Sequence, residues 1–189
     1  MVQKYSQAAI GLGGNLSSKA GRPAETLIAA LAAMQGAGLD LLRVSRFYRT
    51  PAFPPGSGPD FVNACCLVGT GLPPDALLSR LHGIEAALGR ERIVRWGART
   101  VDLDLLAVGD LVLPDRATQD HWRDLPPDRQ TREAPDTLIL PHPRLQDRGF
   151  VLIPLADILP SWRHPVTGLT VSAMRDALSP GEKAGIWPL

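Results

Sequence analysis

The first apolar positions of the chain form a short continuous run, which is typical of a buried strand. Residues 8–12 are followed by Gly13-Gly14-Asn15, a combination that ends a strand in a tight loop. Beyond a polar stretch, Pro23 suits a first helical turn, and apolar side chains recur at helical spacing between residues 27 and 36. The pattern therefore predicts a strand, a loop and a helix.

Two further apolar runs, 39–48 and 61–68, are rich in branched and aromatic side chains and predict two more strands. The segment between them, 50–59, contains too much proline for a helix or a strand. We expect it to form a loop that joins the second and third strands.

The next two elements complete a recognisable order. Pro73-Pro74-Asp75 begins a second helix, leucines and an isoleucine form its apolar stripe, and Gly89 ends it. Residues 100–105 then alternate polar and apolar, as a strand with one buried face does. The order βαββαβ predicts an α+β, ferredoxin-like core: one antiparallel sheet with both helices packed on one face.

The rest of the chain is less regular. Residues 114–137 are rich in proline and charge, which predicts an exposed insertion that Trp122 could anchor. A C-terminal extension carries an apolar run at 150–159 and a short helix-like pattern at 171–178. We find no internal repeat, and residues 1–189 are interpreted as a single domain.

Composition narrows the class of protein. The 189 residues carry 20 Lys plus Arg against 19 Asp plus Glu, a formal net charge of +1, which argues against a nucleic-acid or membrane-surface binder. No apolar run approaches the roughly 20 residues that span a bilayer, so we expect a soluble, cytoplasmic protein. Cys65 and Cys66 are adjacent in an apolar run and are interpreted as buried small hydrophobes.

The segment with the clearest chemistry runs from Gly89 to Asp104. Four arginines, at 90, 92, 95 and 99, lie directly before a strand that bears Asp102 and Asp104. Residues two apart in a strand share a face, with Cα atoms about 6.6 Å apart. Such a pair of carboxylates can hold Mg²⁺, and arginines beside it suit phosphoryl transfer. The alternative is a solvated strand face beside an arginine-decorated loop.

Three other groups of residues are candidates. Phe61 and Asn63 share a strand face, where a ring beside an amide suits a flat heteroaromatic ligand, although an ordinary strand edge has the same pattern. The proline-fixed loop 141–150 presents His142 and Arg148 as anion ligands and Phe150 as a second ring, although a lone loop histidine is most often solvated. Glu85 is either a solvated charge or a polar contact near the arginines.

The glycines at 11, 13 and 14 follow a strand but do not match a dinucleotide fingerprint, because the third glycine is misplaced. A split βαβ order also differs from a doubly wound parallel sheet. We therefore interpret them as a tight turn.

Together these motifs resemble the 6-hydroxymethyl-7,8-dihydropterin pyrophosphokinase family of folate biosynthesis. The resemblance implies transfer of a pyrophosphoryl group from ATP to the hydroxymethyl oxygen of the pterin, with release of AMP. It also implies that the protein is a monomer. It rests on motifs along most of the chain: Gly13-Gly14-Asn15-Leu16, Phe47-Tyr48-Arg49-Thr50-Pro51, Asp60-Phe61-Val62-Asn63-Ala64, Ile84-Glu85 with Gly89-Arg90, residues 95–104, and Pro141-His142-Pro143 with Arg148-Gly149-Phe150.

The resemblance also implies a role for each candidate residue. Asp102 and Asp104 would hold two Mg²⁺ ions, and Arg90 and Arg99 would contact the phosphates and support transfer. The pterin-side residues would be Thr50, Phe53, Phe61, Asn63 and Phe150. The nucleotide-side residues would be Glu85, Arg92, His142 and Arg148, with Trp96 in a loop that closes over the site.

The sequence departs from the family pattern in places. Phe61 stands where a tyrosine is common, and Ala98 where a proline is frequent. The insertion at 114–137 has no counterpart in shorter members, and a lid, a partner contact and an inert loop are all open. Two rival functions also stay open: an RNA-binding ferredoxin-like module and a different metal-dependent phosphotransferase or nucleotide hydrolase.

Overall fold

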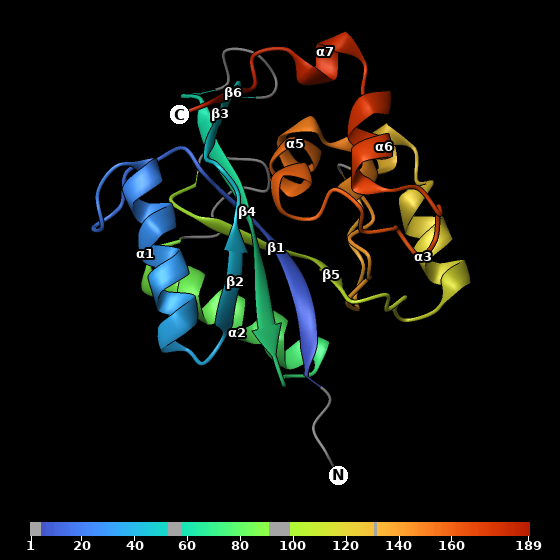
Figure 1. Cartoon of the computed structure of the whole chain (residues 1–189), viewed down its shortest axis with the longest axis horizontal. Helices are drawn as coiled ribbons and strands as arrows, with labels where there is room; N and C mark the ends of the chain where they lie inside the picture. The colour runs from blue at the N-terminus through green and yellow to red at the C-terminus, as the bar shows by residue number, and fades with distance from the viewer. Residues whose placement is uncertain (1–4, 53–57, 91–98, 131) are drawn as a thin grey trace.

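A single antiparallel sheet forms the centre of the protein, a computed structural model that describes residues 5–52, 58–90, 99–130 and 132–189 (Figure 1). Within those ranges the strand order is β5-β1-β4-β3-β6, and β2 pairs with β4 beside β3. The strands are β1 (Ser6–Gly14), β2 (Asp40–Val44), β3 (Tyr48–Thr50), β4 (Phe61–Thr70), β5 (Asp102–Val108) and β6 (Trp187–Pro188). The predicted βαββαβ core is confirmed.

The apolar run at 39–48 forms two strands, so the prediction of one strand is wrong. β2 pairs with the C-terminal half of β4, whereas β3 pairs with its first three residues. Ser45 lies between them, and its backbone N–H donates to the Cys65 carbonyl while its Oγ accepts from the Cys65 N–H, each at 2.9 Å. These bonds hold the chain to β4 while it bends from one short strand into the next.

The two predicted helices cover one face of the sheet. They are α1 (Pro23–Gly36) and α2 (Pro74–Ala87), and both begin with proline in the first turn. Their leucine stripes pack on alternate residues of β1 and β5, including Ile10, Leu103 and Leu105, all at most 3% exposed. Alternation in β5 therefore buries its apolar side chains here and turns Asp102 and Asp104 to the other face.

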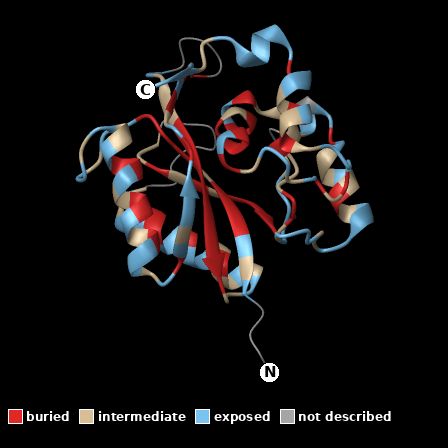
Figure 2. Cartoon of the chain, in the orientation of Figure 1, coloured by how far each residue is buried: buried red, intermediate tan, exposed pale blue. Residues whose placement is uncertain are grey.

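The C-terminal extension covers part of that other face, which the sequence analysis did not predict. It contains η1 (Leu145–Asp147), α5 (Gly149–Ile158), α6 (Val171–Ala177) and α7 (Pro180–Lys183). Leu152 and Leu155, both fully buried, pack from α5 on Cys65 and Leu67 of β4. The sheet is consequently buried between two helical layers, and β4 is buried along eight consecutive residues (Figures 1 and 2).

Residues 114–137 are not simply exposed, so that part of the prediction is corrected. They contain α3 (Arg116–Arg123) and α4 (Pro127–Gln130). Gln119 is fully buried and its amide donates to the Pro141 carbonyl at 3.3 Å, while Leu125 is 4% exposed. Trp122 is half-buried. The segment is therefore attached to the rest of the protein through the buried side chains of Gln119 and Leu125.

Two further findings concern single features. Cys65 and Cys66 are free thiols and fully buried, as predicted. None of the helices in the described ranges is long and apolar enough to cross a membrane.

The second helical layer predicts a stability effect. Leu152→Ala should lower the free energy of unfolding by about 3 kcal/mol, because the side chain is fully buried and would leave a cavity between α5 and the sheet. Urea denaturation monitored by circular dichroism measures it. Leu169→Ala, at a leucine that is 49% exposed, is the control and should change much less. Equal, small effects would contradict a structural role for the extension.

Candidate active site

One row of residues across the sheet brings the predicted site together. Gly13 of β1 lies opposite Asp102 of β5 on one side and Asn63 of β4 on the other. Paired residues of antiparallel strands project to the same face, and so do residues two apart along a strand. Asp104 and Phe61 therefore share that face with Asp102 and Asn63.

The glycines of β1 are strand residues, so the interpretation as a tight turn is wrong. A Cβ at Gly13 would lie 2.6 Å from Asn63 Oδ1, and one at Gly14 would lie 2.5 Å from the Thr100 carbonyl oxygen. Gly11, two residues earlier, would make only ordinary contact, at 3.5 Å from Leu106. Glycine is thus required where polar groups of the site approach the β1 backbone closely.

Two guanidinium groups flank Asp102. Arg90 Nη1 lies 2.7 Å from one carboxylate oxygen, and Arg99 Nη1 forms an ion pair with the other. Burial and the nearby charge of Asp104 raise the pKa of Asp102, against the lowering effect of Arg99 and Arg90. The pair of carboxylates is therefore a place where further positive charge is favoured.

Glu85 supports this arrangement from beneath. It is 2% exposed, which excludes the solvated alternative, and one carboxylate oxygen accepts the Leu103 N–H at 2.7 Å. The same oxygen forms an ion pair with Arg90. Burial raises the pKa of Glu85, while the Leu103 N–H and Arg90 oppose that rise. Glu85 thereby connects α2, β5 and Arg90.

The loop after residue 140 supplies a neutral imidazole. The backbone N–H of His142 donates to the Leu106 carbonyl at 2.8 Å, and the imidazole Nδ1 accepts the backbone N–H of Arg144 at 3.1 Å. Burial, and then the positive charges of Arg148 and Arg144, lower the pKa of His142 to about 3. At neutral pH the proton consequently sits on Nε2, and His142 is an uncharged hydrogen-bond donor, not a cationic ligand for an anion.

Arg148 lies on the same side of the site. Burial lowers the pKa of its guanidinium, and the charge of Asp104 partly offsets that effect. The guanidinium carbon is 5.6 Å from the centre of the Phe150 ring. Phe150 stands in the first turn of α5 and is 39% exposed, so its ring is available for a ligand.

Asn63 and Thr50 form a buried polar pair next to Phe61. Asn63 Nδ2 donates to Thr50 Oγ1 at 2.7 Å, and the two residues are 7% and 4% exposed. Thr50 of β3 pairs directly with Phe61 of β4. The amide of Asn63 keeps a second N–H available for hydrogen bonding, at the end of the sheet where an aromatic ring also lies.

Asn15 is a site-forming residue to which the sequence analysis gave no role. Its Nδ2 donates to the Pro59 carbonyl at 3.0 Å, and its Oδ1 accepts the Arg99 N–H at 2.9 Å. The Asn15 N–H donates in turn to the Arg99 carbonyl. The sequence feature that could have indicated this role is the position of Asn15 directly after the glycines that end β1. Asn15 therefore ties the start of β4 to the loop that carries Arg99.

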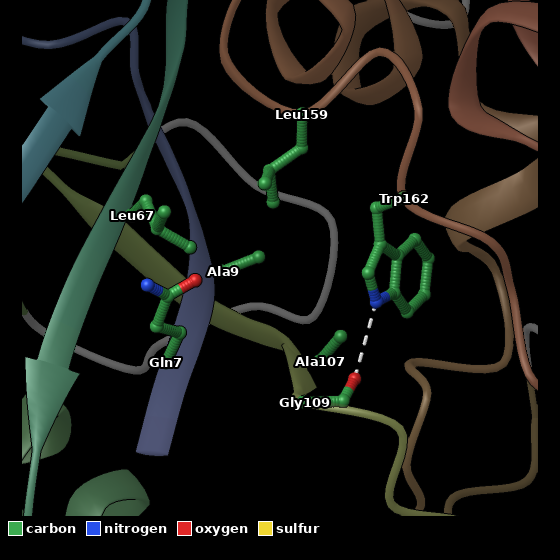
Figure 3. Close-up of a pocket in the computed structure, with 7 residues that line it drawn as sticks. All are labelled: Gln7, Ala9, Leu67, Ala107, Gly109, Leu159 and Trp162. Atoms are coloured by element: carbon green, nitrogen blue, oxygen red, sulfur yellow. Dashed lines mark hydrogen bonds between the residues drawn. The ribbon is translucent and has the colours of Figure 1, made fainter. Parts of the chain in front are cut away.

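Three of the candidate residues, Phe53, Arg92 and Trp96, lie outside the described residues. A small pocket of about 50 Å³ lies elsewhere, towards the N-terminal end of β1 on the face that α5 covers (Figure 3). Its lining, which includes Ala9 and Leu67, is almost wholly apolar, and Trp162 Nε1 donates to the Gly109 carbonyl at its edge. It offers no charged group for a phosphate.

The fold and the site define the class of protein. Paired carboxylates among arginines, on one face of an antiparallel sheet, suit a phosphotransferase. A family model described as 7,8-dihydro-6-hydroxymethylpterin-pyrophosphokinase (HPPK) matches residues 9–160. The chain belongs to this family.

Relatives and solved structures agree. Proteins named 2-amino-4-hydroxy-6-hydroxymethyldihydropteridine pyrophosphokinase from Synechocystis sp. and Pseudomonas aeruginosa are 36% and 38% identical to this chain. The first match covers 99% of this chain and 82% of the Synechocystis protein. The second covers 87% of this chain and 86% of the Pseudomonas protein. A crystal structure of Plasmodium falciparum HPPK-DHPS has a TM-score of 0.65 at 17% identity, covering 92% of this chain and 44% of that one, which shows the fold.

The buried position of Glu85 predicts a large effect of its removal. Glu85→Ala should lower the free energy of unfolding by about 3 kcal/mol, because it leaves the buried Leu103 N–H without its acceptor and removes one of the two carboxylates that pair with Arg90. Urea denaturation measures it. Glu133→Ala removes an exposed carboxylate that pairs with Arg129 and should have little effect. If both variants unfold at the same urea concentration, Glu85 does not hold the site together.

Proposed function

We infer that the protein transfers a pyrophosphoryl group from ATP to 6-hydroxymethyl-7,8-dihydropterin in folate biosynthesis. The hydroxymethyl oxygen attacks the β-phosphorus, the bond from that phosphorus to the oxygen bridging the α-phosphate breaks, and AMP leaves. The hydroxyl proton passes to solvent. The observation that carries this function is the acidic pair on β5 among arginines, in a chain that matches the family over residues 9–160.

We propose that Asp102 and Asp104 hold two Mg²⁺ ions. Two neighbouring carboxylates fit this role, since Mg²⁺ accepts few protein oxygens and keeps positions for water and phosphate. No group of three His, Cys, Asp or Glu side chains suited to a metal occurs among the described residues, and water and substrate oxygens would complete the coordination. Bound Mg²⁺ would neutralise phosphate charge and lower the pKa of the attacking hydroxyl.

Arg90 and Arg99 are proposed to contact the polyphosphate. Each is paired with Asp102, and each is at most 21% exposed in its side chain. Phosphate oxygens would take over these guanidinium N–H groups when ATP binds, so that positive charge meets the charge that develops on the leaving group. Glu85 would keep Arg90 in place through that exchange.

The nucleotide side includes His142 and Arg148. A neutral His142 can donate from Nε2 without adding charge, whereas Arg148 adds a cation near Asp104. Arg92 and Trp96 are assigned to the same side on the family resemblance alone.

The pterin is proposed to bind between Phe61 and Phe150. The Asn63 amide lies next to Phe61 on the same face and can both donate to and accept from the edge of a pterin ring. Thr50 of β3, bonded to Asn63, would contribute from the strand next to Phe61. Phe53 is assigned to the pterin on the family resemblance alone. We also propose that the protein acts as a monomer, as the family resemblance implies, and that it acts in the cytoplasm.

One assay tests the function. ATP, Mg²⁺ and 6-hydroxymethyl-7,8-dihydropterin should give AMP and the diphosphorylated pterin, with no ADP. Production of ADP, or of AMP without the pterin, would indicate another phosphotransferase or a nucleotide hydrolase.

The carboxylate pair predicts the main catalytic effect. Asp102→Asn and Asp104→Asn should each lower kcat by about a thousandfold, because removal of a charged ligand weakens charge stabilisation in the transition state. AMP formation at saturating substrates measures it. Asp110→Asn, at an exposed turn after the same strand, should leave kcat unchanged. Near-normal turnover by either site variant would rule out the paired-metal proposal.

The glycines of β1 predict a selective effect on the pterin. Gly13→Ala should raise the KM for the pterin about tenfold, because the added Cβ would displace Asn63 Oδ1 from 2.6 Å. Steady-state kinetics with each substrate varied measures it. Gly11→Ala is the matched control, because its added Cβ lies on the same face but would make only an ordinary contact, 3.5 Å from the Leu106 side chain. An equal KM in both variants would argue against a pterin contact by Asn63.

A further inference from the structure

The last residues of the chain, 180–189, return to the sheet beside the proposed pterin subsite; we call them the C-terminal tail (Figure 1). β6 pairs with β3 through Tyr48↔Pro188 and Arg49↔Trp187, and the Leu189 N–H donates to the Phe47 carbonyl at 2.8 Å. β3 has only three residues, and its other neighbour is β4. The tail thus supplies the outer partner of the short strand that ends in Thr50.

The tail also touches the residue after Thr50. Gly185 has φ +74°, and a Cβ placed there would lie 2.6 Å from Pro51 Cγ and 3.1 Å from Pro51 Cδ. Only glycine fits both this left-handed conformation and this approach. The position of Pro51, directly after Thr50, therefore depends on the path of the tail.

A second contact reaches the opposite wall. A Cβ at Gly149 would lie 2.2 Å from the Glu182 carbonyl oxygen and 3.2 Å from Ile186 Cδ1, so the tail backbone lies directly against the start of α5. The next residue is Phe150. The tail therefore packs against the first turn of the helix that carries Phe150.

We propose that the C-terminal tail is a positioning segment that sets the separation of the two walls of the pterin subsite: β3, whose Thr50 pairs with Phe61, and the start of α5, which carries Phe150. This inference rests on the proposed function. The tail contacts the immediate neighbour of each wall residue, through Gly185 and through Glu182 with Ile186. The carboxylates that would serve ATP lie on β5, at the other end of the strand order β5-β1-β4-β3-β6. Disturbing the tail should therefore weaken pterin binding selectively.

Gly185→Ala tests the proposal, and the chain offers a matched control. Gly168 has the same φ of +74° but nothing within 4 Å of an added Cβ, so Gly168→Ala introduces the same backbone strain without a contact. Gly185→Ala should raise the KM for 6-hydroxymethyl-7,8-dihydropterin about fivefold, with the KM for ATP and kcat at saturating pterin within about twofold. Gly168→Ala should leave all three values at the wild-type level.

A second variant keeps the test decisive if Gly185→Ala does not fold. Ile186→Ala trims a half-buried side chain and should raise the pterin KM in the same selective way, with fluorescence titration of the pterin giving a matching rise in Kd. Wild-type levels of pterin KM in the folded variants, or equal losses for ATP and pterin, would overturn the positioning role alone. A wild-type enzyme that makes no AMP from the two substrates would overturn the proposed function and this inference with it.

Discussion

The register of β1 between β4 and β5 is the constraint on which the site depends. Because Gly13 lies opposite both Asp102 and Asn63, one row of backbone pairing sets the separation of the acidic pair from the polar pair. A shift by one residue would turn every one of these side chains to the other face and bury charge under α1 and α2. The apolar side chains of β5, packed in that core, therefore hold the face that carries Asp102 and Asp104 in register.

Charge compensation beneath the site follows from this register. Asp102 and Glu85 lie at neighbouring positions where burial raises the pKa of each, and Arg90 contacts both. Buried carboxylates without cations would be costly, so Arg90 stabilises the folded site. If ATP binds to Arg90 and Arg99 as we propose, other positive charge must replace them at Asp102. Binding of a cation and binding of the polyphosphate are thus expected to be coupled.

Local patterns were sufficient to predict the features that depend on local geometry. The alternation at 100–105 predicted the shared face of Asp102 and Asp104, and the leucine stripe predicted α2. The bend at Ser45, the strand glycines and the role of Asn15 depend on partners distant in sequence, such as Cys65, Asn63 and Pro59, which no local period reveals. The second helical layer was missed for the same reason. Whether Phe61 and Phe150 face one ligand stays a prediction.

One face of the sheet is wholly structural, whereas the other carries both a structural cluster and the proposed ligand site. The α1–α2 face is apolar along its length, whereas the opposite face is apolar only where α5 and α6 cover it and polar beyond. Helix α5 covers the sheet with its apolar side chains, and Phe150 in its first turn is the residue that would bind the pterin. The same helix would therefore stabilise the fold and form one wall of the pterin subsite. Asp157 of α5 accepts hydrogen bonds from Arg46 and from Tyr48 of β3, which fixes the far end of the helix to the same strand that carries Thr50. The spacing of the two ligand walls is therefore a property of how α5 docks on the sheet edge, and any element that contacts both, as the C-terminal tail does, acts on that spacing directly.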